Sequence, residues 1–157
     1  MTDAQMPLTV CFQDDALVVV DKPCGMLVHR SDIDAQETTF LLQTLRNQLN
    51  QSLFPVHRLD KATSGLVIFA FNRDVARTLS QAFEHGEVTK TYEAFVRGHT
   101  PQRLHIDHAL RDEVDSKGRK IKNGTKREAS TELRTVTSWT VPEPVDRYPE
   151  ARYSHVQ

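Results

Sequence analysis

The sequence predicts an α+β fold with a mixed, largely antiparallel central sheet and flanking helices. Short β-branched runs bounded by turn residues indicate strands. Two other stretches repeat apolar residues at helical spacing. The 157 residues are 38% apolar and 26% charged, which suits one domain, residues 1–157, with a real core.

The first two strands are expected at Thr9–Gln13 and Leu17–Asp21. Both are β-branched, and the Asp14-Asp15 pair between them is typical of a turn. Pro23 and Gly25 end the second strand.

A helix is expected next, capped by Thr38 or Thr39 and ending near Leu49, because leucines recur in it at helical spacing. The apolar run Gly65–Phe71 predicts a central strand.

A second helix, Asp74–His85, is expected to be capped by Asn72 and stopped by Gly86 in a left-handed conformation. Alternation over Thr89–Val96 predicts a strand, and Ile106–Leu110 is a candidate for the next one.

Further along, Asn123-Gly124 is a two-residue hairpin signal. A strand is expected at Glu132–Trp139, and Pro142, Pro144 and Pro149 interrupt regular structure beyond it.

Composition excludes several classes of protein. No apolar run is long enough to cross a bilayer, so no membrane association is expected. The N-terminus carries Asp3 and no basic segment, which is unlike a secretory signal. Cys11 and Cys24 are not spaced as a CxxC pair, and reduced thiols in the cytoplasm are the simplest interpretation.

Charge is unevenly distributed. Residues 1–99 carry 9 basic and 12 acidic side chains, whereas residues 100–157 carry 11 and 9. The run Ser116–Arg127 has six bases and no acid, which favours contact with nucleic-acid phosphates. The alternative is a solvated hairpin tip. The candidate contacts are Lys117, Arg119, Lys120 and Lys122.

Asp60 is the candidate catalytic residue. It stands in the segment HRLDKATSGL, between a basic dipeptide and a Thr-Ser-Gly turn that leads into an apolar strand. A carboxylate so placed is fixed by the strand yet open to a ligand. The alternative is that Asp60 only caps the turn with its side chain.

Three motifs carry a resemblance to a known family. They are HRLD-x-x-TSGL from His57, Lys90-Thr91-Tyr92, and the segment Leu17–His29, which reads LVVVDKPCGMLVH. In this order they resemble the RluA-type pseudouridine synthases over essentially the whole chain. The segments IDHAL from Ile106 and RYPEARYS from Arg147 are most similar to its tRNA-modifying branch, tRNA pseudouridine synthase C.

The resemblance implies the catalytic-domain fold of pseudouridine synthases and an isomerase that converts a uridine of tRNA, U65 in the T-stem, to pseudouridine. An rRNA-modifying or dual-specificity relative is the alternative, and a non-catalytic RNA-binding remnant is another. RNA is thus the expected partner. Exchanging the N1 bond of uracil for a C5 bond requires no redox step or hydrolytic water, so no cofactor is expected. Cys24 and His29 alone are too few for a zinc site, and no metal is expected.

The resemblance also assigns roles. Asp60 acts as nucleophile at C1′ or as the base that removes the 2′ proton, and the sequence leaves both open. Tyr92 stacks on the uracil and relays the C5 proton, the alternative being a core tyrosine. Lys90, two residues earlier, contacts the RNA. Arg58 fills the gap left by the extruded base, or else contacts a phosphate or forms a surface ion pair. His57 lies with these RNA-contacting residues, although a hydrogen-bonded turn histidine is the simpler role.

In the family, the strand that begins near Tyr153 continues into a segment of the form T-G-R-x-H-Q-(I/L)-R-x-H. That segment supplies an arginine paired with the catalytic aspartate, and nothing in residues 1–157 resembles it. On this basis we expect the catalytic domain to be truncated, with an exposed sheet edge that favours self-association. Residues 1–157 alone are then expected to be inactive.

Overall fold

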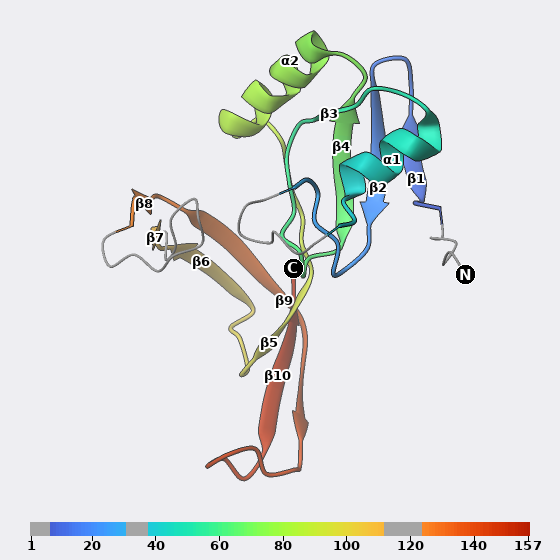
Figure 1. Cartoon of the computed structure of the whole chain (residues 1–157). Helices are drawn as coiled ribbons and strands as arrows, with labels where there is room; N and C mark the ends of the chain where they lie inside the picture. The colour runs from blue at the N-terminus through green and yellow to red at the C-terminus, as the bar shows by residue number, and fades with distance from the viewer. Residues whose placement is uncertain (1–6, 31–37, 112–123) are drawn as a thin grey trace, which may run out of the picture. The chain divides into compact units, whose positions relative to one another are not determined.

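The computed structural model describes residues 7–30, 38–111 and 124–157 (Figure 1). The chain forms two compact units, Met1–Thr89 and Lys90–Gln157. Every described pair of neighbouring strands is antiparallel. The two described helices belong to the first unit. The expected α+β, largely antiparallel fold is confirmed, with the strands divided among separate sheets. A single domain over 1–157 stays a prediction.

The first unit contains a four-stranded sheet in the order β1-β2-β4-β3. Its strands are Val10–Gln13 (β1), Leu17–Lys22 (β2), Phe54–Pro55 (β3) and Gly65–Ala70 (β4). β4 lies inside the sheet, as its apolar sequence predicts, and pairs along its whole length with β2. The short strand β3 has no sequence signal of its own.

The turn between β1 and β2 forms at the predicted aspartates. The Asp14 carboxylate accepts hydrogen bonds from the backbone N–H groups of Leu17 and Ala16, each at 2.8 Å. These bonds favour the ionised form and hold the pKa of Asp14 below its usual value.

The core of the first unit follows from strand alternation. Val18 and Val20 of β2 and Val67 and Phe69 of β4 are fully buried on one face of the sheet. Helix α1, Leu41–Leu49, adds its leucines to the same cluster.

Helix α1 begins later than the threonine signal predicts. Its N-cap is Phe40, without a side-chain hydrogen bond. Instead, the backbone N–H groups of Leu41 and Leu42 donate to the carbonyls of Leu27 and Val28, at 2.8 and 2.9 Å. The Thr38 or Thr39 cap is therefore wrong, because a distant segment satisfies the orphan donors of the first turn.

Helix α2, Arg73–Glu84, forms as expected. The Asn72 side chain accepts a hydrogen bond from the backbone N–H of Val75 at 2.9 Å, and Gly86 adopts a φ of 72°. Both ends of α2 are thus set by residues next to the helix in the sequence. The helix packs on β3 and β4. Neither described helix is long and apolar enough to span a membrane.

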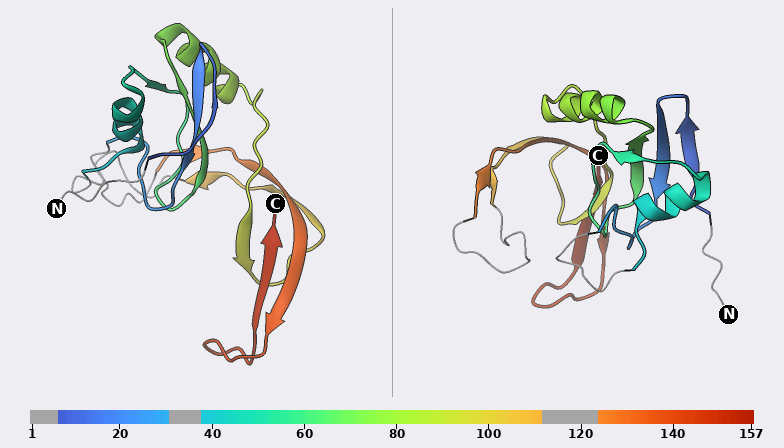
Figure 2. Two further views of the ribbon diagram at one scale, coloured as in Figure 1. Left: turned by 90° about the vertical axis from the view of Figure 1, so that its right-hand side faces the viewer. Right: turned by 45° about the horizontal axis from the view of Figure 1, so that its top comes forward.

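The second unit contains a sheet in the order β5-β10-β9-β6. Its strands are Ala94–Arg97 (β5), Arg103–Asp107 (β6), Ser130–Val141 (β9) and Ala151–Val156 (β10). The first residues of β9 pair with β6 and the later ones with β10, and Figure 2 shows β9 curving between these two partners. Two short strands, Leu110–Arg111 (β7) and Lys126–Arg127 (β8), form a separate pair.

Strand boundaries in this unit differ from the expectations. Pairing of β5 with β10 begins at Ala94, so the expected strand Thr89–Val96 lacks its first five residues. The expected strand Ile106–Leu110 is split between β6 and β7.

The hairpin predicted at Asn123-Gly124 stays a prediction. Arg111 pairs with Lys126, so the connection between β7 and β8 is much longer than two residues. Asn123 itself lies outside the described residues.

One face of the second sheet carries an aromatic cluster. The Trp139 ring stands edge-on to Phe95 and stacks on Tyr153, each with a centroid distance of 5.8 Å, and Phe95 lies 5.0 Å from the His155 ring. The other face is held by hydroxyl groups. Buried Ser154 accepts a hydrogen bond from the N–H of Thr100 at 3.0 Å and donates to the carbonyl of Gly98 at 2.9 Å.

Candidate active site

Asp60 lies on a tight turn between the core and β4. The residue before it, Leu59, is buried in the hydrophobic cluster of the first unit. The backbone N–H of Thr63 donates to the Asp60 carbonyl at 3.1 Å and closes the turn. The Asp60 carboxylate is exposed, and no hydrogen bond to it is found from the described residues. The turn is thus closed by the backbone, so the side-chain cap considered as the alternative is not formed.

The two carbonyls that follow Asp60 are held by the segment after β2. The backbone N–H of Gly25 donates to the Lys61 carbonyl at 2.8 Å, and the Cys24 thiol donates to the Ala62 carbonyl at 3.1 Å. Gly25 has a φ of 84°, a conformation that favours glycine. The backbone around Asp60 is therefore fixed while its carboxylate faces solvent.

Lys22 joins the two segments from inside. Strand alternation places it on the core-facing side of β2, after Val18 and Val20, and it is fully buried. Its ammonium donates to the carbonyls of Pro23 at 3.0 Å, Met26 at 2.7 Å and Lys61 at 3.3 Å. Three acceptors match the three N–H bonds of an ammonium group.

Burial lowers the pKa of Lys22 from its ordinary value, and the charges of Cys24 and Asp60 oppose that shift. Lys22 is thus both an anchor of the Asp60 turn and a positive charge close to it.

His57 fixes the backbone segment that leads to Asp60. At Val56 the chain leaves its pairing with β4, where the Val56 N–H donates to the Ile68 carbonyl at 3.3 Å. The Nε2 atom of His57 then accepts the Ile68 N–H at 3.1 Å and continues the ladder with a side chain. The imidazole also stacks on Phe83 of α2, with centroids 4.4 Å apart. This geometry gives His57 a positioning role, and its predicted contact with RNA stays a prediction.

We expect His57→Phe to destabilise the first unit. Phenylalanine keeps the stack on Phe83 but leaves the Ile68 N–H without its acceptor, which costs about 1–3 kcal/mol for a buried donor. Chemical denaturation measures the loss. His85→Phe is the matched control, because His85 is exposed and its ion pair with Glu87 is long, at 3.9 Å. Equal stability of His57→Phe and the unaltered chain would contradict the positioning role.

Arg58 is exposed beside this loop. Within the described ranges its guanidinium forms no ion pair or hydrogen bond, so the alternative of a surface ion pair is not observed there. Its roles in base replacement or phosphate contact stay predictions.

Lys90 and Tyr92 belong to the second unit, just before β5, and both are exposed. Tyr92 is 54% exposed, so it is not buried among the described residues, and its role stays a prediction. The predicted RNA contacts Lys117, Arg119, Lys120 and Lys122 lie outside the described residues. The last two bases of that run, Lys126 and Arg127, form the exposed strand β8.

Sequence reasoning missed the roles of Lys22 and Cys24, although both stand in a segment that it singled out. One signal was available for Lys22. In β2 a charged residue follows two valines at alternate positions, so it falls on the face where an apolar residue is expected. A charge there requires several buried acceptors.

Comparison with known proteins covers nearly the whole chain. The family model described as RNA pseudouridylate synthase matches residues 16–156. The chain is 44% identical over 149 residues to tRNA pseudouridine synthase C of Pectobacterium carotovorum subsp. carotovorum, and this match covers 94% of the chain and 40% of the relative. It is 42% identical over 152 residues to tRNA pseudouridine synthase C of Haemophilus influenzae, with 96% and 64% covered. The chain thus spans less than two thirds of either relative.

Solved structures agree on the fold. The human protein RNA pseudouridylate synthase domain containing 1 superposes with a TM-score of 0.68 at 22% identity, over 99% of this chain and 62% of that one. The human protein RNA pseudouridylate synthase domain containing 4 superposes with a TM-score of 0.64 at 23% identity. This match covers 94% of this chain and 57% of that one. The resemblance inferred from three short motifs is confirmed, and the chain belongs to the RNA pseudouridylate synthase family.

Proposed function

We propose that the protein to which this chain belongs is an RNA pseudouridine synthase in which Asp60 is the catalytic residue. The observation that carries the proposal is the Asp60 turn, where an exposed carboxylate stands on a backbone whose next two carbonyls are held by Gly25 and Cys24. A catalytic group must be held in place before substrate arrives, and this arrangement does so. Family membership supplies the reaction class.

The reaction exchanges one bond to the ribose for another. The bond between N1 and C1′ breaks, the uracil turns, C5 bonds to C1′, and C5 loses a proton while N1 gains one. Asp60 either attacks C1′ or removes the 2′ proton to give a glycal, and an ionised carboxylate serves both routes. The atoms balance without an oxidant, a reductant or a hydrolytic water, so the proposal includes no cofactor.

The proposed substrate is tRNA, because the relatives with the higher identity are named tRNA pseudouridine synthase C. The finer proposal is U65 of the T-stem, and a cytoplasmic location goes with a tRNA substrate. Arg58 is proposed to occupy the space left by the extruded uridine. Lys90 and the basic residues of the run Ser116–Arg127 are proposed to contact the RNA.

The test is to map pseudouridine in total tRNA and rRNA from a strain in which the gene encoding this chain is deleted. We expect one pseudouridine in the T-stem to be lost and to return when the gene is restored. Loss of an rRNA site instead would assign the alternative substrate. An unchanged map would contradict the proposed function.

Tyr92→Phe is expected to stop the reaction while the protein still folds. The variant keeps an aromatic surface for the uracil but lacks the hydroxyl proposed to relay the C5 proton. General acid–base groups contribute about 10²–10⁴-fold to rate, so a loss of this size is expected. Tritium release from tRNA labelled at C5 of uridine measures it, with Tyr153→Phe as the control for the same chemical change in the same unit. Full activity of Tyr92→Phe would leave only the stacking role.

A further inference from the structure

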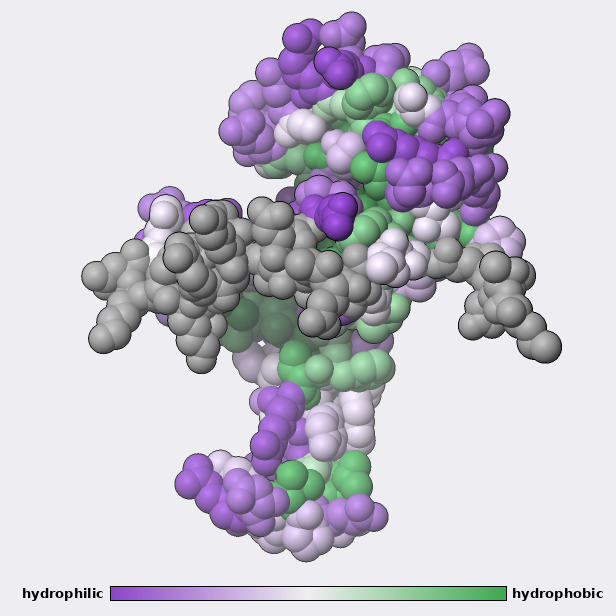
Figure 3. Space-filling view, viewed as in Figure 1, coloured by the Kyte–Doolittle hydropathy of each residue, from purple (hydrophilic) through white to green (hydrophobic). Residues whose placement is uncertain are grey.

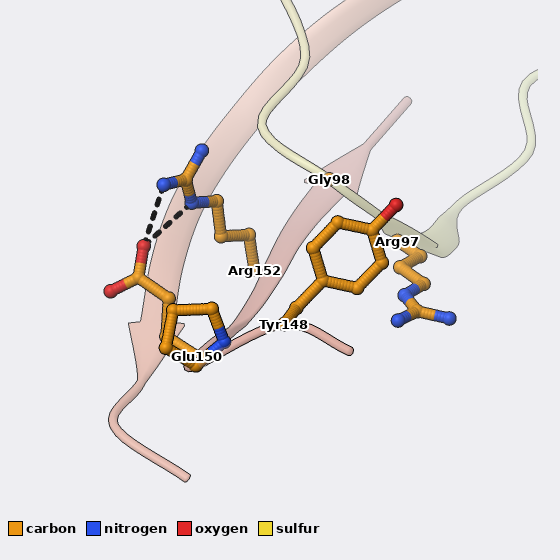
Figure 4. A pocket seen from close by; sticks show the side chains of 6 residues that line it. Arg97, Gly98, Tyr148, Glu150 and Arg152 are labelled. Atoms are coloured by element: carbon orange, nitrogen blue, oxygen red, sulfur yellow. Dashed lines mark hydrogen bonds and ion pairs between the residues drawn. The ribbon is translucent and has the colours of Figure 1, made fainter. Parts of the chain in front are cut away.

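A cluster of arginines and one tyrosine lies at the end of the β9–β10 hairpin, and it includes none of the residues assigned above. It includes Arg97, Arg147, Tyr148 and Arg152. An open cavity of about 450 Å³ is lined in part by Arg97, Tyr148 and Arg152 (Figure 4). The lining residues are Arg97, Gly98, Tyr148, Pro149, Glu150 and Arg152. They come from the end of β5 and from the segment that leads into β10.

The backbone builds this cluster from both segments. Val145 and Tyr148 exchange two hydrogen bonds, of 3.0 and 3.1 Å, around a turn in which Asp146 has a φ of 56°. The N–H of Gly98 donates to the Arg152 carbonyl at 2.7 Å and holds the end of β5 against the start of β10. The tyrosine is therefore presented on a closed turn, 46% exposed, beside a fixed strand end.

Two guanidinium groups share the Tyr148 ring. The Arg97 guanidinium carbon lies 5.5 Å from the ring centroid and that of Arg147 lies 5.2 Å from it. Arg147 also donates a hydrogen bond to the Tyr148 hydroxyl at 3.1 Å. Attraction of cations to the face of an aromatic ring orients both groups.

The charges in the cluster are not equally neutralised. Arg152 forms an ion pair with Glu150. Its Nε and Nη2 atoms both lie 2.7 Å from Oε1 of Glu150, as the dashed lines in Figure 4 show. Among the described residues, neither Arg97 nor Arg147 pairs with a carboxylate, and Asp146 of the same turn forms no ion pair with them. Figure 3 shows hydrophilic residues beside hydrophobic ones at this end of the hairpin. Two positive charges near one ring, without a described carboxylate partner, favour a nearby anion.

We propose that this cluster binds the sugar-phosphate backbone of the substrate RNA, an inference that rests on the proposed function. Guanidinium forks bind phosphate through paired hydrogen bonds, and the exposed Tyr148 ring offers a face on which a base or ribose packs. Arg97 and Arg147 are the phosphate ligands, while Glu150 holds Arg152 in place at the rim. Such contacts position the RNA and do not select its sequence.

The test is binding of tRNA to the whole protein to which this chain belongs, measured by filter retention at several salt concentrations. The double variant Arg97→Gln/Arg147→Gln is expected to lower the slope of log affinity against log salt by about two, because each lost phosphate contact removes about one. Affinity at low salt is expected to fall roughly tenfold or more. Arg97→Lys/Arg147→Lys keeps the charges and is expected to keep the slope.

The matched control is Arg73→Gln/Arg77→Gln on α2. It removes the same charge and also one arginine–aromatic contact, since Arg73 lies 5.8 Å from the Phe54 ring centroid. If this control lowered the salt slope and the affinity as much as the hairpin variant does, net charge would govern binding and the inference would be overturned. An unchanged salt slope in the hairpin variant would overturn it as well. If the whole protein to which this chain belongs bound no RNA without any substitution, the proposed function itself would fail, which is a separate result. Competition by uridine monophosphate at concentrations comparable to tRNA would point to a free nucleotide instead of an RNA backbone and would also overturn it.

Discussion

Asp60→Asn is expected to abolish pseudouridine formation, with turnover falling by a factor on the order of 10⁴ or more, as when a nucleophile or its base is removed from other enzymes. Asparagine has nearly the same shape, but its amide is neither a nucleophile at C1′ nor a base for the 2′ proton. The backbone of the turn is held through the carbonyls of Lys61 and Ala62, so the fold is expected to persist.

The measurement is pseudouridine mapping of tRNA from cells whose gene carries Asp60→Asn. Tritium release from the purified protein gives the rate. Asp21→Asn is the control, because Asp21 is an exposed carboxylate on β2 of the same unit. Binding of tRNA is expected to stay within a few-fold of the unaltered protein. Turnover by Asp60→Asn close to that of the control would remove Asp60 from the mechanism.

Lys22→Met is expected to destabilise the first unit, by about 1–3 kcal/mol for each buried carbonyl left without a donor. Methionine fills much of the same space, but it leaves the carbonyls of Pro23, Met26 and Lys61 without the ammonium donor. The Lys61 carbonyl keeps the N–H of Gly25 as a donor, so the cost arises mainly at the carbonyls of Pro23 and Met26. Equilibrium unfolding in urea measures the loss, with exposed Lys126→Met as the control.

The pH dependence of this effect has a definite sign. Because burial lowers the pKa of Lys22 in the folded chain, the unfolded chain binds more protons between the lowered pKa and the ordinary value of 10.5. The contribution of Lys22 to stability is therefore complete above the ordinary value and is lost as the pH falls through the lowered one. The difference in stability between the unaltered chain and Lys22→Met is expected to widen as the pH is raised toward 10.5. A difference that narrowed would contradict the assigned direction.

The sequence predicts those parts of the fold whose causes are local. Helix α2 is an example, because Asn72 and Gly86 act on neighbouring backbone groups. The start of α1 could not be predicted, since its first N–H groups are satisfied by the carbonyls of Leu27 and Val28. The same holds for β5, whose first residue is set by its pairing with β10.

The candidate site, too, is predictable from the sequence only where its causes are local. Asp60 is recognisable because its neighbours form a contiguous motif. The anchoring of its turn is not, because the bonds to the Lys61 and Ala62 carbonyls come from residues almost forty positions earlier in the chain. The cluster on the hairpin likewise depends on a contact between Arg97, at the end of β5, and Tyr148, in the turn between β9 and β10.

Trp139 is the single tryptophan of the chain, and it lies in the second unit against Phe95 and Tyr153. Its fluorescence therefore reports on that unit alone, whereas far-ultraviolet circular dichroism also records the helices α1 and α2 of the first. Coincidence or separation of the two signals during denaturation distinguishes one cooperative transition from two. A single optical experiment on the unlabelled protein thus reveals whether residues 1–157 melt as one body.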